Sequence, residues 1–548
     1  MSKYIALPDS VTPPLPDSRS AGPVNRSEIS SVTIRVRSAG NVEDLEKRAY
    51  EQSALPPSER TYLSREELAK AYGAASDDLQ KVEEYAQKHN LVVVHRSSSE
   101  RAIVLKGTLG DLLNAFPTEV KMFHHASGTY QARVADVSVP DELQGIVTGV
   151  FGFDTRPKHR APHHSKMLAA SAGPGGTNGV SPTEFAKRYN FPKEVNGKKL
   201  DGTGQTIAII ELGGGFRASD LSVYFKEIGV KQPAVSFVSV DHVGNSPAGD
   251  PNSDDGEVML DIEVAGAVAP GAKIVVYFAP NRGNKGFIDA ISAAVHDTER
   301  NPDVISISWG LGEDFVDQQS MNAFHEIFAA AANAGITICA ATGDHGVADA
   351  PTWDGKIHVD HPASDPLVTA CGGSQVDNGH DVVWNEGGGW TTGGGISQMF
   401  TVPPYQAGIT QPAVLGGGKP GRGVPDIAMS ATNYFVRVDS SEGASGGTSA
   451  VAPLMSALVV LLNQGAGKNV GFLNPLMYSN PGAFHDVTKG TNAIAPNVPG
   501  YTAGPGWDAC TGLGTPDGKA MLKLLTPAHD VRNVEGGCRV CGGHLSKL

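Results

Sequence analysis

A serine in a glycine-rich stretch is the first residue whose surroundings suggest chemistry. Residues 442–453 read EGASGGTSAVAP and lead into an apolar helix predicted from Pro453 onward. Gly446 and Gly447 allow a close backbone approach that a Cβ would block, which presents Ser449 at the start of this helix. Unpaired amides and the positive dipole end of a first turn favour an oxygen nucleophile and a developing oxyanion. Ser449 is therefore a candidate nucleophile; the alternative is that the Gly-Thr-Ser run only caps a buried helix.

A serine hydroxyl is a weak nucleophile and needs a neighbouring base. None of the 17 histidines lies in a subtilisin-like setting such as Gly-His-Gly-Thr. Glu257 and Asp261 lie four residues apart on one face of an apolar helix that Asp254 or Asp255 would cap. Two carboxyl groups in one apolar site cannot both ionise easily, so one is held protonated and their pKa values separate. The pair suits a general base that works in acid; the alternative is a solvated acidic helix start.

A third motif, ATGDHG at residues 341–346, completes a set that resembles the sedolisins, the serine-carboxyl peptidases, and most closely the kumamolisin type. The three motifs agree with that family in order and approximate spacing, and the resemblance covers nearly the whole chain. It implies a subtilisin-like core in which glutamate replaces the histidine base. The roles that it implies are Ser449 as nucleophile, Glu257 as base and later acid, Asp261 as the partner of Glu257, and Asp344 as oxyanion donor.

The oxyanion role has a consequence for pH. An aspartate donates a hydrogen bond to an oxyanion only when it is protonated, so Asp344 must be neutral in the working enzyme. We expect activity to rise as the pH falls through the pKa of Asp344, and to fall again once the Glu257/Asp261 pair takes up the proton that it must be free to accept. By resemblance, Glu211 and Trp309 form a supporting network behind the pair.

Apolar strands alternate with helices around these residues. Strands are expected at 205–211, 274–278, 304–309 and 336–341, and helices at 287–300 and 318–333. This repetition predicts a parallel sheet covered on both faces, with Glu211, Trp309 and Asp344 at strand ends. Together with the resemblance, it predicts an α/β fold: a subtilisin-like parallel sheet flanked by helices, preceded by a ferredoxin-like α/β sandwich as prodomain.

The N-terminal third divides into two expected parts. Residues 1–28 are rich in Pro, Ser and Asp and lack the features of a secretory signal, so we interpret them as a flexible leader. Residues 29–155 alternate short strands with helices, one of which begins with a capping box from Ser64 to Glu67. This sandwich is large enough to fold alone and resembles the sedolisin prodomain, a chaperone and inhibitor. Without the family, it would equally suit a binding module.

Residues 156–179 have the composition of an exposed linker, and we predict that maturation cleaves there. Its histidines, His159, His163 and His164, are interpreted as positive linker residues or a pH trigger rather than a metal site. The peptidase domain is expected over 180–528.

A calcium site is expected within the peptidase domain by resemblance. One structural Ca²⁺ would be surrounded by two aspartate side chains and three backbone carbonyls, hard oxygen ligands that suit this ion. The residues are Asp486, Val487, Gly504, Gly506 and Asp508. In the same domain, Asp360 could attract basic substrate side chains.

The five cysteines are too few and too scattered for a disulfide scaffold. Cys339 and Cys371 lie in apolar contexts and are expected to be buried thiols. The tail 529–548 carries Cys538, Cys541 and His544, which give three ligands where zinc needs about four, so a disulfide or free pair is favoured.

Composition excludes several classes of function. The net charge of −14 argues against nucleic acid, and no continuous run reaches the roughly 18 apolar residues of a membrane span. The sequence therefore predicts an acid-acting serine-type endopeptidase that works through an acyl-enzyme, acts on proteins or peptides, and is made as an autoprocessed zymogen. By resemblance it would be extracellular, and we expect a monomer. The rivals are a subtilisin-type enzyme that uses histidine and a noncatalytic, calcium-stabilised binding protein on the same fold.

Overall fold

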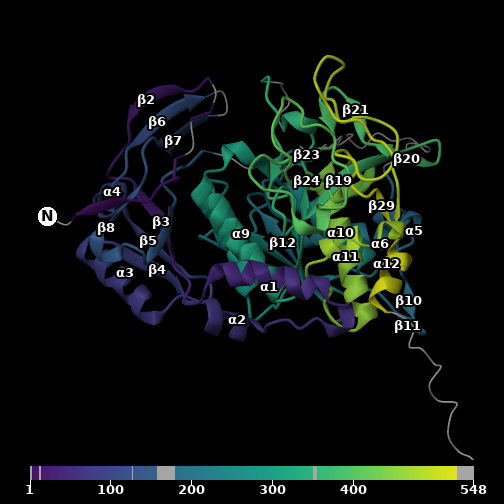
Figure 1. Ribbon diagram of the computed structural model, residues 1–548, viewed down its shortest axis with the longest axis horizontal. Coiled ribbons are helices and arrows are strands. Elements are labelled where there is room, and N and C mark those ends of the chain that lie inside the picture. Colours follow the sequence, from purple (N-terminus) through teal and green to yellow (C-terminus); the bar gives the residue numbers. More distant parts are fainter. Residues whose placement is uncertain are drawn as a thin grey trace, which may run out of the picture.

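The computed structural model describes residues 3–11, 14–15, 17–125, 128–156, 179–349 and 354–526. A smaller N-terminal unit packs against the side of a larger C-terminal unit (Figure 1). The linker histidines and the tail cysteines fall outside the described residues, so the predictions made for them stay predictions.

A mostly parallel sheet forms the centre of the larger unit. Its strands, in spatial order, are β13 (Ala234–Ser239), β14 (Lys273–Phe278), β12 (Thr206–Glu211), β15 (Val304–Ile307), β17 (Thr337–Ala341) and β19 (Thr369–Asp377). β25 (Ile427–Ser430) pairs with β19 in parallel, and β20 (His380–Val383) pairs with it antiparallel. The four predicted strands are β12, β14, β15 and β17, so the predicted parallel sheet is confirmed.

Helices cover both faces of this sheet. On one face α7 (Asp255–Val268) and α10 (Thr448–Ala466) pack against each other, and on the other lie α8 (Lys285–His296) and α9 (Gln318–Asn333). The remaining helices are α5 (Pro182–Arg188), α6 (Ala218–Glu227), α11 (Asn474–Tyr478) and α12 (Gly518–Leu525). The predicted α/β class, with helices on both faces, is confirmed.

The helix α10 is the one described helix with the length and composition of a membrane span. Polar residues such as Ser456 interrupt its apolar residues, which is why no continuous run marks it in the sequence. Of its most apolar stretch, 83% is buried inside the fold. We therefore interpret α10 as the core helix of the larger unit.

Short strands and hairpins complete the larger unit. They are β10 (Glu194–Val195), β11 (Lys198–Lys199), β16 (Leu311–Gly312), β18 (Asp360–His361), β21 (Asn385–Gly387), β22 (Trp390–Thr391), β23 (Gly395–Ile396), β24 (Gly423–Val424), β26 (Tyr434–Val438), β27 (Ser441–Ser445), β28 (Phe484–His485) and β29 (Thr515–Pro516). The β26–β27 hairpin leads directly into α10.

The smaller unit is built on a four-stranded antiparallel sheet. The order is β4 (Val92–Ser97), β5 (Ala102–Thr108), β3 (Ile29–Val36) and β9 (Val147–Phe151), and α3 (Ser76–Lys88) and α4 (Leu109–Ala115) pack on it. The predicted α/β sandwich is confirmed. Two further helices, α1 (Val42–Ala54) and α2 (Arg65–Tyr72), complete the unit, and α2 begins with the predicted capping box.

The prediction of a flexible leader over residues 1–28 is wrong. β1 (Tyr4–Ala6) pairs with β8 (Ser138–Pro140), and β2 (Arg19–Pro23) joins a sheet with β6 (Val120–His125) and β7 (Gly128–Arg133). Between them, Ser10 is buried and hydrogen-bonds to Asp136. These strands are only three and five residues long and pair with segments more than 90 residues away, so no local pattern reveals them.

The two units meet through charged contacts. Helix α1 packs on α9, and Glu326 of α9 accepts hydrogen bonds from Arg35 and Arg101 of the smaller unit. Thr33 also donates to Asp289 of α8, with the oxygens 2.6 Å apart. Arginine and threonine side chains on β3 and just before β5 therefore reach carboxylates on the helices that cover one face of the larger sheet.

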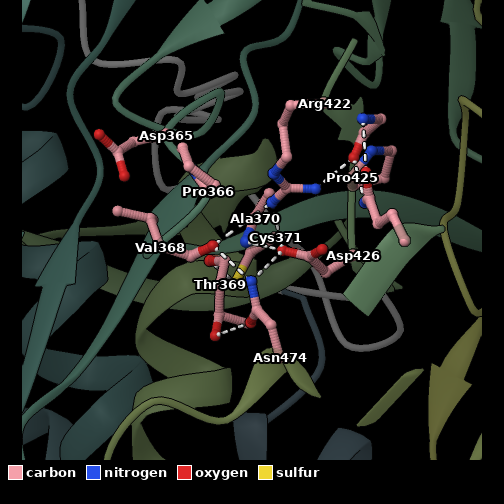
Figure 2. Close-up of polar contacts among 12 residues, drawn as sticks. Asp365, Pro366, Val368, Thr369, Ala370, Cys371, Arg422, Pro425, Asp426 and Asn474 are labelled. Carbon is pink, nitrogen blue, oxygen red and sulfur yellow. Dashed lines mark hydrogen bonds and ion pairs between the residues drawn. The ribbon is translucent and has the colours of Figure 1, made fainter. Parts of the chain in front are cut away.

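A buried ion pair fixes the last parallel strand. Asp426, just before β25, accepts from the Ala370 amide at 2.7 Å, from Arg422 at 2.6 Å and from Tyr478 at 2.8 Å. Figure 2 shows Arg422 and Asn474 converging on this carboxylate. Both charged side chains are fully buried. A buried carboxylate needs a cation and several donors, so this cluster serves the fold rather than the chemistry.

Candidate active site

Ser449 lies in the first turn of α10. The preceding Gly447 has φ of 107°, and a Cβ on Gly446 would lie 2.3 Å from the carbonyl oxygen of Ala431. Glycine is therefore required at both positions, as predicted. Gly447 is the N-cap residue, so neither Thr448 nor Ser449 acts as a cap. Ser449 is fully buried, and its Oγ has no hydrogen-bond partner among the described residues.

The carboxyl pair lies inside the fold. Glu257 and Asp261 are both fully buried on α7, the helix that packs against α10, so the alternative of a solvated acidic helix start does not hold. Burial, and after it the charge of Glu257, raises the pKa of Asp261 well above its ordinary value. Asp254 is the N-cap residue of α7 but makes no side-chain capping bond, while Asp255 accepts from the Gly249 amide.

Two predicted supporting residues extend this acidic cluster. Trp309 Nε1 donates to Glu211 Oε2 at 2.9 Å, and both side chains are buried. Burial, followed by the charges of Asp261 and Glu257, raises the pKa of Glu211 well above its ordinary value. The three carboxyl groups of Glu211, Glu257 and Asp261 thus lie buried in one region of the fold.

Asp344 lies close to Ser449. Its Oδ1 accepts from the Thr448 amide at 2.8 Å and from Thr448 Oγ1 at 2.9 Å. These two bonds fix the carboxyl group against the first turn of α10, one residue before Ser449. With one oxygen held as an acceptor, a proton on the other would be aimed away from Thr448, as an oxyanion donor requires.

The five residues predicted to bind calcium come together near the C-terminus. The Gly506 amide donates to Asp486 Oδ2 at 2.8 Å, and the Gly504 amide donates to Asp508 Oδ2 at 3.2 Å. Thr511 Oγ1 joins the two halves, since it lies 3.4 Å from the Val487 carbonyl and bonds to Asp508. Among the described residues no group of three or more His, Cys, Asp or Glu side chains could hold a metal. A metal here would depend on backbone carbonyls.

Comparison with known proteins agrees with this geometry. Residues 16–156 match the family described as "Pro-kumamolisin, activation domain", and residues 242–479 match the subtilase family. Kumamolisin from Bacillus sp. (strain MN-32) is 44% identical over 533 residues, which cover 94% of both chains. The chain belongs to the sedolisin family of serine-carboxyl peptidases. Sedolisin from Pseudomonas sp. (strain 101) is 27% identical, over 92% of this chain and 89% of that protein.

A solved sedolisin structure supports the fold assignment. Pseudomonas sedolisin complexed with two molecules of pseudo-iodotyrostatin superposes with a TM-score of 0.54 at 30% identity, over 64% of this chain and 99% of that one. The present sedolisin is a serine-carboxyl peptidase made as a zymogen, acts on proteins, and carries its inhibitor in the same chain. The matched activation domain begins at residue 16, which agrees with the strands found before residue 29.

One residue that contacts both α7 and α10 is not indicated by the sequence. Ser308, the residue after β15, has its Oγ 2.9 Å from both carboxyl oxygens of Asp261 and 3.2 Å from the Ser449 carbonyl. In the sequence it reads as one more residue of an apolar strand. The signal that could have found it is its position immediately before Trp309, at the strand end where the site residues gather.

Asp360 differs from the expectation of a substrate-facing carboxylate. It is buried, and a Cβ on Gly310 would lie 2.2 Å from its Oδ1. Burial, followed by the charges of Asp349 and Asp344, raises the pKa of Asp360 well above its ordinary value. Asp360 therefore belongs to the acidic interior of the full-length chain. Cys339 and Cys371 are buried free thiols, as predicted.

Proposed function

We propose that this sedolisin is an acid-acting endopeptidase in which Ser449 is the nucleophile, Glu257 the base, Asp261 its partner and Asp344 the oxyanion donor. The observation that carries the assignment is the pair of bonds from Thr448 to Asp344, which sets the carboxyl group beside the residue that attacks. The burial of all four side chains supports it, because buried carboxyl groups keep protons that exposed ones lose.

The reaction proceeds in two halves. Ser449 Oγ attacks the peptide carbonyl and its proton passes to Glu257, while the oxyanion accepts a hydrogen bond from protonated Asp344. Glu257 then gives the proton to the leaving amine, and the acyl group stays on Ser449. In the second half water attacks the acyl-enzyme, Glu257 takes the water proton and returns it to Ser449 Oγ. Burial raises the pKa of Asp261, and the Glu257/Asp261 pair shares one proton in acid, so one carboxylate of the pair remains to accept the proton of Ser449 through Glu257.

The test uses peptides labelled in the middle and at the ends. Wild-type enzyme should cleave internal bonds in acid, while Ser449→Ala and Glu257→Gln should lose about three or more orders of magnitude in kcat. Release of tripeptides alone from the N-terminus would contradict the endopeptidase assignment. Full activity of the Ser449→Ala variant would contradict the site.

We also propose that maturation cuts within residues 156–179, after acidification. The contacts of Glu326 with Arg35 and Arg101 support an acid trigger, because protonation of the carboxylate removes the charge that holds these arginines. Intact mass over time, with Ser449→Ala as control, tests the cut. Loss of the N-terminal unit from wild type alone is expected; cleavage of both proteins would require another protease.

The calcium residues fit their proposed ion. Asp486 and Asp508 supply carboxylate oxygens, and the bonds from Gly506 and Gly504 bring the two backbone segments to them. One Ca²⁺ would hold these loops rather than take part in the chemistry. Calcium content after dialysis and the thermal midpoint with a chelator test this. Protein that retains no calcium after dialysis, and whose thermal midpoint is the same with and without the chelator, would refute the site. Asp486→Asn, which replaces one of the proposed carboxylate ligands, is the variant to compare with wild type.

The sedolisin is further proposed to work as a monomer outside the cell. Its acidic net charge of −14 and its acid chemistry support an acidic extracellular setting. Size-exclusion chromatography with light scattering tests the monomer. Cell fractionation of the producing organism tests the location, and activity confined to the cytosol would contradict it.

A further inference from the structure

Ser308 connects the carboxyl pair to the helix that carries the nucleophile. It follows β15, is fully buried, and lies between Asp261 on α7 and Ser449 on α10. Its Oγ is within hydrogen-bond distance of both Asp261 oxygens, at 2.9 Å, and of the Ser449 carbonyl, at 3.2 Å. One hydroxyl therefore has acceptors on both catalytic helices.

Pro453 explains why the Ser449 carbonyl accepts from a side chain. In an α-helix the carbonyl of residue 449 accepts from the amide of residue 453, and proline has no N–H. The proline ring also crowds the carbonyl of the residue four positions earlier, which opens that carbonyl to other donors. Ser308 donates there, so the sequence of α10 creates the acceptor that Ser308 satisfies.

A hydroxyl has one proton to donate but can also accept. When Asp261 is ionised, it accepts the Ser308 proton, and the Ser449 carbonyl loses its donor. When Asp261 is protonated, its own O–H donates to Ser308 Oγ, and the Ser308 proton turns to the Ser449 carbonyl. The two arrangements differ by one proton on Asp261.

We propose that Ser308 is a positioning residue that couples the charge of the carboxyl pair to the first turn of α10: its proton points to Asp261 when Asp261 is ionised and to the Ser449 carbonyl when Asp261 is protonated. The inference depends on the proposed roles of Ser449 and the carboxyl pair. The titratable groups that face Asp261 are Glu257 on the same helix and Glu211 at the end of β12. Both of these groups are acidic, whereas Ser308 is a neutral donor to Asp261. Burial and the charge of Glu257 raise the pKa of Asp261, and the hydrogen bond from Ser308 acts in the opposite direction and lowers it.

Removal of the hydroxyl should move the pH profile. In Ser308→Ala the pair, which shares one proton, loses a donor to its remaining negative charge, so it takes up its second proton at higher pH, and the acidic limb of kcat/KM should shift upward by about one pH unit. The matched control is Ser306→Ala. Ser306 is equally buried on β15, and its hydroxyl has no partner among the described residues, so its removal should leave the limb unmoved.

A second pair of variants separates the two acceptors. Pro453→Ala supplies the missing amide to the Ser449 carbonyl, so Ser308→Ala/Pro453→Ala should recover the thermal midpoint lost in Ser308→Ala while its acidic limb stays shifted. Ser308→Thr keeps a hydroxyl and should retain the wild-type limb. The double variant also provides the measurement if Ser308→Ala alone does not fold.

The outcomes are distinct. An unmoved limb in Ser308→Ala, or an equal shift in Ser306→Ala, overturns the proposal. If Pro453→Ala restores both the thermal midpoint and the acidic limb of Ser308→Ala, the proposal is also overturned, because the missing donor to the Ser449 carbonyl would then explain the whole effect. If wild type itself shows no acidic bell, the proposed function fails instead.

Discussion

Replacement of Asp344 by asparagine separates its geometry from its proton. The amide keeps the shape of the carboxyl group, and its oxygen can still accept from Thr448 N and Oγ1, which lie 2.8 and 2.9 Å from Asp344 Oδ1. The NH₂ group then occupies the place of the carboxyl O–H and donates at every pH. Asp344→Asn should therefore retain catalysis and lose the alkaline limb of the pH profile.

The magnitude follows from the fraction of protonated Asp344. In wild type this fraction falls about tenfold for each pH unit above the pKa of Asp344, so two units above it about 1% of the activity remains. Asp344→Asn keeps its donor, and its activity relative to wild type should rise about 100-fold over the same interval. At the acidic optimum we expect the variant within about tenfold of wild type, because a neutral amide is a weaker donor than a carboxylic acid. Asp344→Ala removes the donor and should cost about 10²–10³ in kcat.

The assay is kcat for an internally quenched peptide, measured across the acidic and neutral range. Variants are matured by a trace of tagged wild-type enzyme, which is then removed, and equal thermal midpoints confirm that the fold is kept. An asparagine variant as inactive as the alanine variant would refute the donor role. An alkaline limb that stays in place in Asp344→Asn would refute its assignment to Asp344.

Three other substitutions test the structure. Arg422→Met should lower the free energy of unfolding in urea by about 3–5 kcal/mol, because it leaves buried Asp426 without its cation, and a second change to Asp426→Leu should recover most of this. Burial alone would raise the pKa of Glu326, but two arginines of the activation domain, Arg35 and Arg101, hold it below its usual value. The contact of Glu326 with these arginines stabilises the precursor above the pKa that Glu326 has without them, and this stabilisation is lost as the pH falls through the lowered pKa. Glu326→Gln precursor should therefore begin processing at higher pH. Burial raises the pKa of Glu263 well above its usual value, so stability is lost as pH rises through that pKa, and Glu263→Gln should melt higher than wild type at neutral pH but equally in acid.

The sequence predicted the parts of the site that depend on local patterns. A helical spacing of four placed Glu257 and Asp261 on one face, and two glycines marked the approach to Ser449. The strands β12, β15 and β17 are continuous apolar runs, which are typical of a buried parallel sheet, and their ends carry Glu211, Trp309 and Asp344. For these residues, position in an element sufficed to predict position in the fold.

Contacts between distant segments could not be predicted in this way. Ser308 is one polar residue after a strand, and its role depends on two helices that are 47 and 141 residues away in the chain. The strands β1 and β2 are too short to show a pattern of their own, and they become strands only by pairing with β8 and β6. Asp360 follows an apolar valine and lies two residues before a proline, a context that resembles an exposed turn, yet its carboxyl group packs against Gly310. In each case the deciding neighbour is remote in sequence.

Acid dependence in this sedolisin is a property of the packed interior rather than of single residues. Glu211, Glu263 and Asp360 all have pKa values raised by burial, on β12, on the catalytic helix α7 and on β18 respectively. Carboxyl groups of this kind pack well when protonated and cost free energy when ionised, since each would then be a charge taken out of water. The protonation that the proposed oxyanion role of Asp344 requires is thus the same condition that stabilises the surrounding core. A neutral-pH sedolisin on this scaffold would need changes at these buried positions as well as at Asp344.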